Sequence, residues 1–155
     1  MPGQHAAAAA NAGLRIITSR FGELAVDTTK SIAFPRGLLG LPEKANYVIA
    51  NFPSEKMQQF KILQSLDDDA LAFIVLPLDT QNAILTEADI RTASLELQID
   101  EANLAVMMVV SVHRSPDAVR LSVNARAPLF VDVERRVGTQ YVFQSDRYLV
   151  QHYIN

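Results

Sequence analysis

The stretch Phe60–Leu78 constrains the fold more than any other, because two apolar runs in it flank a turn of three carboxylates, Asp67–Asp69. The first run, residues 60–66, follows the two-residue period of a β-strand, with Gln64 as the single polar residue on its apolar side. The second run, residues 71–76, is apolar throughout, as in a strand that is covered on both faces. The sequence therefore predicts a hairpin at the centre of a small β domain.

Short strand patterns separated by turn signals recur along the rest of the chain, at the spacing of roughly ten residues that is typical of barrels and sandwiches. The expected strands are residues 14–18, 24–26, 31–34, 47–50, 104–112, 119–123, 129–133 and 139–143, followed by an extended end at 148–154. The fold class expected is mostly β: a small antiparallel barrel-like or sandwich-like single domain with about one short helix. Residues 14–155 form this domain, and residues 1–13, which are small and patternless, are expected to be a disordered tail.

One helix is expected at about residues 87–97. Thr86-Glu87-Ala88-Asp89 matches the capping-box signal for a helix start, and Ile90, Ala93 and Leu97 recur at helical spacing. Alternation of apolar residues at 95, 97 and 99 leaves a short strand as a competing interpretation of the helix end.

The loop Phe34–Pro42 contains two glycines and two prolines but is unusually apolar. Its leucines are expected either to close one end of the core or to form a shaped surface for a partner.

Composition excludes several classes of function. The chain of 155 residues has 14 basic and 17 acidic residues and a net charge of -3, so it lacks the basic surplus of a protein that binds nucleic acid directly. It has no cysteine, which excludes disulfides and thiolate chemistry. No apolar run is long enough for a membrane span and no basic start precedes the alanine run at residues 6–10, so the expected location is the cytoplasm, away from membranes.

The sequence carries no strong catalytic, cofactor or metal signature. The spacing of His5, His113 and His152 matches no metal motif, and no phosphate loop or nucleophile elbow is present. Asp67–Asp69 has the ligand type of a hard cation site but is better explained as a solvated turn, with an acidic patch for a basic partner as the third alternative. Arginines near the C-terminus alternate with acidic residues, which is typical of a mixed solvated surface.

Two amides require an explanation, because Gln64 and Asn124 lie in or at the end of apolar strands. A buried amide without partners costs about 1–3 kcal/mol. Either both amides bond internally to backbone groups, or one or both point into a protein-binding groove.

In order and spacing, several segments resemble the flagellar assembly factor FliW family, from about Ile16 to His152. The matching segments are Phe21-Gly22-Glu23, Phe34-Pro35-Arg36-Gly37-Leu38-Leu39-Gly40, Leu63-Gln64-Ser65, Leu71-Ala72-Phe73 with Pro77, Val123-Asn124, Ala127-Pro128-Leu129, Gln140 and Tyr148-Leu149-Val150-Gln151-His152.

The resemblance implies a β-barrel-like regulator of flagellar assembly without enzymatic activity or cofactor. Members of the family bind flagellin and antagonise the translational repressor CsrA allosterically, which relieves repression of flagellin synthesis. The expected partners are therefore CsrA and flagellin, and the protein itself is expected to be a monomer. The residues expected to form the protein-binding site are Gln64, Ser65, Asp67, Asn124, Arg126 and Pro128. The alternatives are a small β-barrel domain that binds a ligand or cofactor, with or without enzymatic activity, and a structural subunit of a flagellar assembly.

Overall fold

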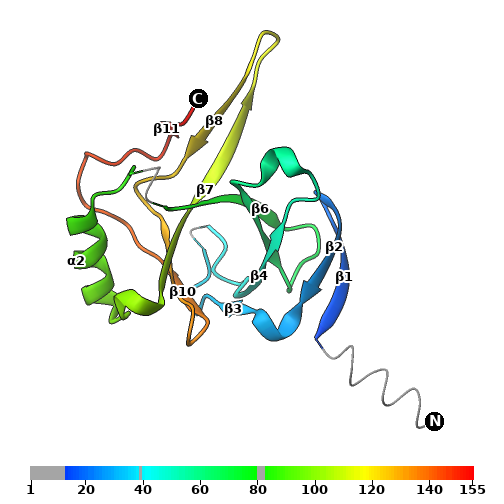
Figure 1. Cartoon of the computed structure of the whole chain (residues 1–155), viewed down its shortest axis with the longest axis horizontal. Coiled ribbons are helices and arrows are strands. Elements are labelled where there is room, and N and C mark those ends of the chain that lie inside the picture. Colours follow the sequence, from blue (N-terminus) through cyan, green and yellow to red (C-terminus); the bar gives the residue numbers. More distant parts are fainter. Residues whose placement is uncertain (1–12, 39, 80–82) are drawn as a thin grey trace.

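The computed structural model describes residues 13–38, 40–79 and 83–155 and shows a closed barrel of seven strands (Figure 1). The ring runs β7-β6-β5-β4-β3-β10-β9 and closes by a second pairing of β9 with β7. The barrel strands are β3 (Ile32–Ala33), β4 (Asn46–Asn51), β5 (Lys61–Ser65), β6 (Ala72–Pro77), β7 (Leu104–Arg114), β9 (Leu129–Asp132) and β10 (Val137–Gln140). All pairs in the ring are antiparallel except β10 with β3. The expected mostly-β single domain is confirmed, and of its two forms the barrel is the observed one.

The predicted central hairpin is present as β5 and β6, and both faces of β5 are buried. Leu63 points into the barrel and packs with Tyr47, Val75 and Leu129. Ile62, its neighbour in sequence, points outward and is equally inaccessible to solvent. A strand with two covered faces needs a second layer outside the barrel wall.

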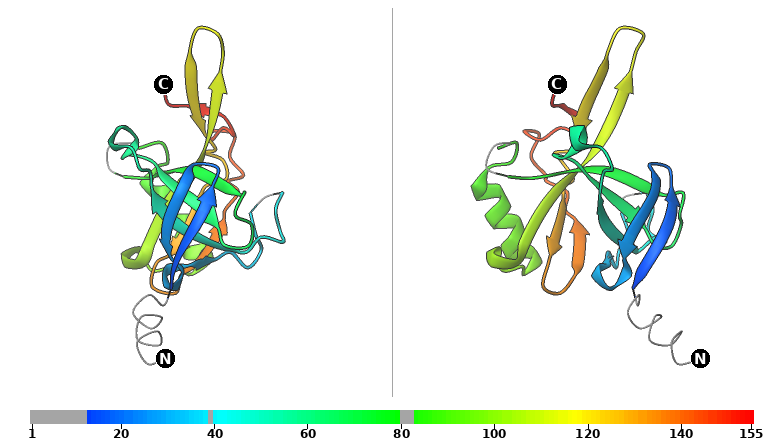
Figure 2. Two further views of the ribbon diagram at one scale, coloured as in Figure 1. Left: turned by 90° about the vertical axis from the view of Figure 1, so that its right-hand side faces the viewer. Right: turned by 45° about the vertical axis from the view of Figure 1, so that its right-hand side comes forward.

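That second layer is a hairpin of β1 (Leu14–Ser19) and β2 (Gly22–Asp27), which lies against the outside of the barrel (Figures 1 and 2). Its inner face contributes Ile17, Leu24 and Val26, and these pack on Ile62 and on neighbouring barrel residues. Gly22 closes the tight turn with φ of 102°, a conformation that glycine adopts without steric cost.

Helix α2 (Glu87–Leu97) covers another part of the barrel wall. Thr86 caps it by accepting a hydrogen bond from the Asp89 backbone N–H, as the sequence signal predicts. Ala93 is buried in the cluster that also contains Val106 and Phe130. The helix continues to Leu97 and ends at Gln98, which takes the left-handed conformation with φ of 59°, so the competing strand interpretation of residues 95–99 is wrong.

Strands β7 and β8 (Val119–Val123) continue beyond the barrel as a projecting two-stranded arm (Figure 2). The short strand β11 (His152–Tyr153) pairs with β8 at the base of this arm, so the extended chain end docks as expected. Among the described residues there are three short 3-10 turns: η1 (Thr28–Lys30) and η2 (Glu55–Met57) each link two strands, and η3 (Glu101–Asn103) links α2 to β7.

Strand β10 begins at Val137, two residues earlier than the expected strand at residues 139–143, because the turn after β9 begins directly at Asp132. The Asp132 carboxylate accepts hydrogen bonds from the backbone N–H groups of Glu134 and Arg135 and so begins the turn directly after β9. Arg136 takes the left-handed conformation in the turn, with φ of 57°. Gly138 lies inside β10, where an added Cβ would be 2.4 Å from the Phe34 ring. This glycine is needed for close packing and not for the turn.

The expected tail, residues 1–13, lies outside the described residues apart from Gly13, whose carbonyl accepts a hydrogen bond from the Thr28 backbone N–H. Within the described part of the chain, no helix is long and apolar enough to cross a membrane.

Candidate docking site

A shallow groove of about 230 Å³ lies between the loop after β3, the barrel wall and the chain end. Its lining combines apolar side chains with amides: Leu38, Phe73, Val109, Ser111, Asn124, Gln140, Val150 and Gln151. Such a mixed, open surface is suited to contact with another protein, since it offers both apolar area and hydrogen-bonding groups.

Two of the amides in the groove hold the backbone of Ala127, one through its N–H and the other through its carbonyl. The Asn124 side-chain oxygen accepts a hydrogen bond from the Ala127 N–H at 3.0 Å. Gln140 Nε2 donates to the Ala127 carbonyl at 2.9 Å. The turn that ends in Pro128 is therefore fixed on both sides of Ala127, and the buried Pro128 accepts a further bond from the Tyr141 N–H through its carbonyl.

The segment beside the groove presents two large apolar side chains to solvent. Leu149 is 55% exposed and Val150 is 59% exposed. Their backbone is nevertheless fixed, because the Leu149 carbonyl accepts hydrogen bonds from the N–H groups of both Ala125 and Arg126. Neither exposed side chain contributes to the core, so this segment is the strongest apolar docking feature near the groove.

The residue before this pair is the anchor of the segment. Tyr148 is buried, its hydroxyl donates to the Asp89 carboxylate at 2.5 Å, and the hydroxyl oxygen accepts from the Thr86 N–H at 3.1 Å. The bond from Tyr148, followed by the bond from Thr86, lowers the pKa of Asp89 below its ordinary value, and Arg147 lies 2.7 Å from the same carboxylate. Helix α2 and the chain end are thus joined at one point.

The acidic turn is built from within by Gln64 and Ser65, which are both fully buried. Gln64 Nε2 donates to the carbonyl oxygens of Ser65, Asp69 and Leu71 at 3.0–3.2 Å, so this amide bonds internally. Among the residues that the structure describes, Gln64 Oε1 has no hydrogen-bond partner. Ser65 Oγ accepts from the N–H groups of residues 67 and 68, each at 3.0 Å. These two side chains therefore shape the turn and do not themselves reach the surface.

The three carboxylates of the turn each have a protein partner. Asp67 accepts from the backbone N–H groups of Ala45 and Asn46, and the Asn46 bond is the first cause that lowers the pKa of Asp67. Asp69 pairs with Arg15 at 2.8 Å, and Asp68 accepts from the N–H of residue 70. Among residues 13–38, 40–79 and 83–155, no group of three or more side chains of metal-ligand type is placed to hold an ion.

The six expected site residues thus fall into two places, and Pro128 ends the turn beside Asn124 that the two amides hold. Asn124 lines the groove, and Arg126 beside it is half-buried, with its guanidinium 3.9 Å from the Asp146 carboxylate. Gln64, Ser65 and Asp67 belong to the acidic turn. Strand β6 connects the two places, since it begins just after the turn and its Phe73 lines the groove.

Sequence reasoning missed Leu149 and Val150. The sequence does contain a signal for these two residues, because adjacent side chains of an extended segment point to opposite sides. When such a segment lies at the surface, at least one side chain of a large apolar pair faces solvent. Leu38 combines the two alternatives given for its loop, because it is 5% exposed and packs in the core while it also lines the groove.

A profile of the family described as "FliW protein" matches residues 15–154. The chain belongs to the FliW family. A flagellar assembly factor FliW from Geotalea uraniireducens is 30% identical over 145 residues, which cover 90% of this chain and 83% of that protein. The corresponding protein of Geobacter sulfurreducens is 30% identical over 141 residues, covering 90% and 85%.

The solved structures agree on the fold. A crystal structure of the flagellar assembly factor FliW superposes with a TM-score of 0.67 and covers 90% of this chain and 96% of that one, at 23% sequence identity. Several of the segments on which the sequence resemblance rests lie at the groove or the acidic turn: the loop with Leu38, Gln64-Ser65, Phe73, Asn124, Gln140 and residues 148–152. Phe21-Gly22-Glu23 lies instead at the turn of the β1–β2 hairpin. The profile match over residues 15–154 includes the candidate site as well as the barrel.

Proposed function

We propose that this protein is a cytoplasmic, non-enzymatic regulator of flagellar assembly that binds flagellin and the translational repressor CsrA. Binding to CsrA acts allosterically, away from the RNA-binding surface, and relieves the repression of flagellin translation. Flagellin competes for the same regulator, so translation responds to the amount of free flagellin. Membership in the FliW family and the names of its relatives support the flagellar role.

The observation that carries the proposal is the exposed pair Leu149 and Val150 on a hydrogen-bonded backbone. A protein interface gains most from apolar side chains that are fixed before binding, because less conformational entropy is lost on association. The net charge of -3 adds complementarity to a basic RNA-binding partner.

Within this site, Asn124 and Arg126 form the polar rim, and Asp67 adds a carboxylate on the neighbouring turn. Gln64, Ser65 and Pro128 are buried, so they contribute by holding the turn and the loop in place. Substitutions at these buried positions act on affinity through the shape of the surface.

The test is titration calorimetry of the purified protein with CsrA and, separately, with flagellin. The double variant Leu149→Ser/Val150→Ser should bind at least one partner about tenfold more weakly, because it removes two apolar contacts. Val133→Ser is the matched control, since Val133 is 53% exposed but lies in the turn after β9. Both variants should unfold at the wild-type temperature.

If the double variant binds both partners with unchanged affinity, the docking site does not include Leu149 and Val150. If the wild-type protein binds neither partner, the proposed function is wrong.

The allosteric part has a separate readout. The protein should release a fluorescently labelled leader RNA of the flagellin message from CsrA, and the amount of protein needed should rise when flagellin is added. A control titration of the labelled RNA with this protein alone tests whether the protein binds the RNA directly. Direct binding would contradict the allosteric mechanism.

A further inference from the structure

The first turn of α2 is completed by a residue from the other end of the chain. Thr86 caps the helix and Asp89 follows three residues later, which is the spacing of a capping box. In a capping box, the acidic side chain at that position accepts a hydrogen bond from the backbone N–H of the cap residue. Here the Thr86 N–H donates instead to the Tyr148 hydroxyl at 3.1 Å, and this hydroxyl donates to Asp89 at 2.5 Å. Tyr148 is thus inserted between the two members of the box.

The Asp89 carboxylate holds two consecutive residues of the chain end. It accepts a hydrogen bond from Arg147 Nη2 at 2.7 Å, beside the bond from the Tyr148 hydroxyl. Hydrogen bonds to an ionised group are stronger than bonds between neutral groups. Leu149 and Val150, here called the docking pair, follow these two residues directly. One side chain on α2 therefore holds the chain immediately before the docking pair.

Backbone hydrogen bonds do not fix the chain just before the docking pair. In the part of the chain that the structure describes, the backbone of residues 144–148 bonds to no other element. The next such bonds are those that the Leu149 carbonyl accepts from the N–H groups of Ala125 and Arg126. Side chains therefore determine how the chain enters the docking pair, and the shortest of their polar contacts to other elements are the two with Asp89.

We propose that Asp89 is a positioning residue of the docking site. By holding Arg147 and Tyr148, its carboxylate fixes the conformation of the docking pair that follows them. The inference rests on the proposed function, since it concerns the same docking pair, and it adds the residue on α2 that controls this pair. A segment that is fixed before association loses less conformational entropy on binding. Asp89 does not line the groove, so its effect on affinity is exerted through the chain end.

The first test needs no partner and measures how firmly the chain end is held. Asp89→Ala should speed hydrogen exchange of the Arg126 amide about tenfold, the equivalent of losing one hydrogen bond to a charged group. This amide reports on the chain end because the Leu149 carbonyl accepts its hydrogen bond. The Tyr141 amide, which donates to the Pro128 carbonyl, is the internal control and should keep its rate. Wild-type exchange at Arg126 in Asp89→Ala would overturn the proposal.

The second test measures affinity by calorimetry, with whichever of CsrA and flagellin the Leu149→Ser/Val150→Ser variant binds more weakly. Asp89→Ala should bind that partner about tenfold more weakly and with a less favourable binding entropy, since the docking pair must then be ordered on association. A loss of affinity without this entropy change, or no loss at all, would overturn the positioning role.

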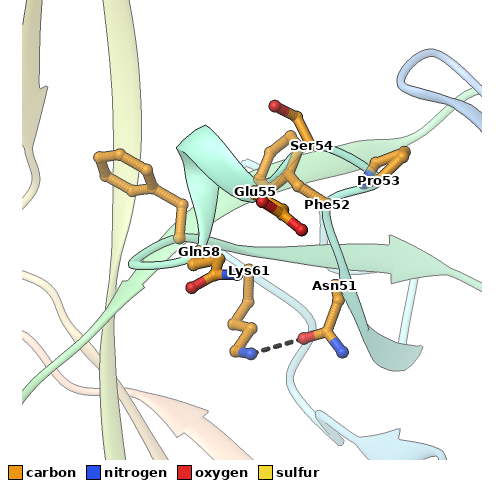
Figure 3. A pocket seen from close by; sticks show the side chains of 8 residues that line it. Asn51, Phe52, Pro53, Ser54, Glu55, Gln58 and Lys61 are labelled. Atoms are coloured by element: carbon orange, nitrogen blue, oxygen red, sulfur yellow. Dashed lines mark hydrogen bonds between the residues drawn. The ribbon is translucent and has the colours of Figure 1, made fainter.

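Two control variants should bind as the wild type does. Glu87→Ala removes an exposed carboxylate from the same first turn of α2, and in the described part of the chain Glu87 takes part in no ion pair. Asn51→Ala removes the acceptor of the Lys61 ammonium group in the hollow of about 410 Å³ beside η2, which Figure 3 shows. An equal loss of affinity in either control would overturn the specific role of Asp89.

A double-mutant cycle tests whether Asp89 acts through Tyr148. Tyr148→Phe removes the hydroxyl that donates to Asp89 and should also weaken binding. Because both changes break the same hydrogen bond, the variant Asp89→Ala/Tyr148→Phe should lose less affinity than the two separate losses multiplied together. Fully multiplicative losses would show that the two residues act independently and would overturn the proposal.

Failure of this inference and failure of the proposed function give different results. If the docking-pair variant binds weakly but Asp89→Ala binds with wild-type affinity, the docking site stands and the role of Asp89 is overturned. If the wild-type protein binds neither partner, the proposed function is wrong, and exchange at the Arg126 amide alone decides whether Asp89 positions the chain end.

Discussion

At the scale of single residues, the loop between β3 and β4 depends on Gly37. Its φ of 65° is in the left-handed region, and an added Cβ would be 2.4 Å from the Leu41 carbonyl oxygen. Leu38, which follows it, packs in the barrel interior and also lines the docking groove. The glycine thus connects local backbone conformation to both stability and the shape of the site.

Gly37→Ala should lower the free energy of unfolding by about 2–4 kcal/mol, since it adds a steric clash to the cost of the left-handed conformation. Gly40→Ala is the matched control, because Gly40 also has a positive φ, 83°, but has open space where a Cβ would lie. The control should lose only about 1–2 kcal/mol. Urea unfolding measures both, and equal losses would show that the contact with Leu41 is unimportant.

Asp67 links the acidic turn to the start of β4 and gives stability a pH dependence. Backbone bonding, first from Asn46, lowers the folded-state pKa of this carboxyl. Its contribution is therefore fully present above the ordinary carboxyl pKa of about 4 and is lost as the pH falls through the folded-state value. Asp67→Asn should be less stable than the wild type at pH 7 and should lose less stability on acidification.

Thermal unfolding between pH 7 and pH 2 checks this expectation. Asp117→Asn, which removes an exposed carboxylate from the tip of the arm, is the control. Parallel stability curves for Asp67→Asn and the wild type would mean that the bonds from Ala45 and Asn46 do not favour the charged form.

At the scale of elements, helix α2 is held by its first turn. Thr86 caps the helix and Tyr148 bonds to both the Thr86 N–H and the Asp89 carboxylate, so the cap also anchors the segment with Leu149 and Val150. The helix start, which the sequence predicts from a local signal, is therefore also a tertiary joint.

Thr86→Ala should lower the free energy of unfolding by about 1 kcal/mol through the lost cap. Tyr148→Phe should, in addition, loosen the chain end, seen as faster hydrogen exchange at residues 149–153. Thr92→Ala, on the exposed side of the same helix, is the control and should leave that exchange unchanged. Wild-type exchange rates in Tyr148→Phe would contradict the anchoring role.

At the scale of the whole molecule, β5 belongs to two hydrophobic clusters at once. Ile62 packs under the β1–β2 hairpin and Leu63 packs inside the barrel, and neither has measurable exposure. Because adjacent residues of one strand belong to different clusters, the hairpin layer and the barrel are expected to unfold together.

Ile62→Ala and Leu63→Ala should each lower the free energy of unfolding by about 2–5 kcal/mol, as expected for large buried side chains. Each should give a single transition with the same midpoint by circular dichroism and by tyrosine fluorescence. Loss of the hairpin layer before the barrel in Ile62→Ala would show that the two layers are separate folding units.

Features that depend on local pattern could be predicted from the amino-acid sequence alone. The alternation and apolar runs around Asp67–Asp69 predicted the β5–β6 hairpin, and the Thr86–Asp89 signal predicted the start of α2. The helical spacing of Ile90, Ala93 and Leu97 marks the face of α2 that packs on the core, where Ala93 is buried and the other two are partly buried. These features arise from contacts within a few residues, so their period and capping chemistry are visible in the chain.

Features that depend on distant partners became visible only in the folded chain. Folding closed the barrel through β7 and β9, included one parallel pair, gave Gly138 a packing role against Phe34, and placed Gln64 and Ser65 inside while it left Leu149 and Val150 exposed. The physical reason is that the period of a strand tells which residues share a face, whereas the cover on that face comes from segments far along the chain.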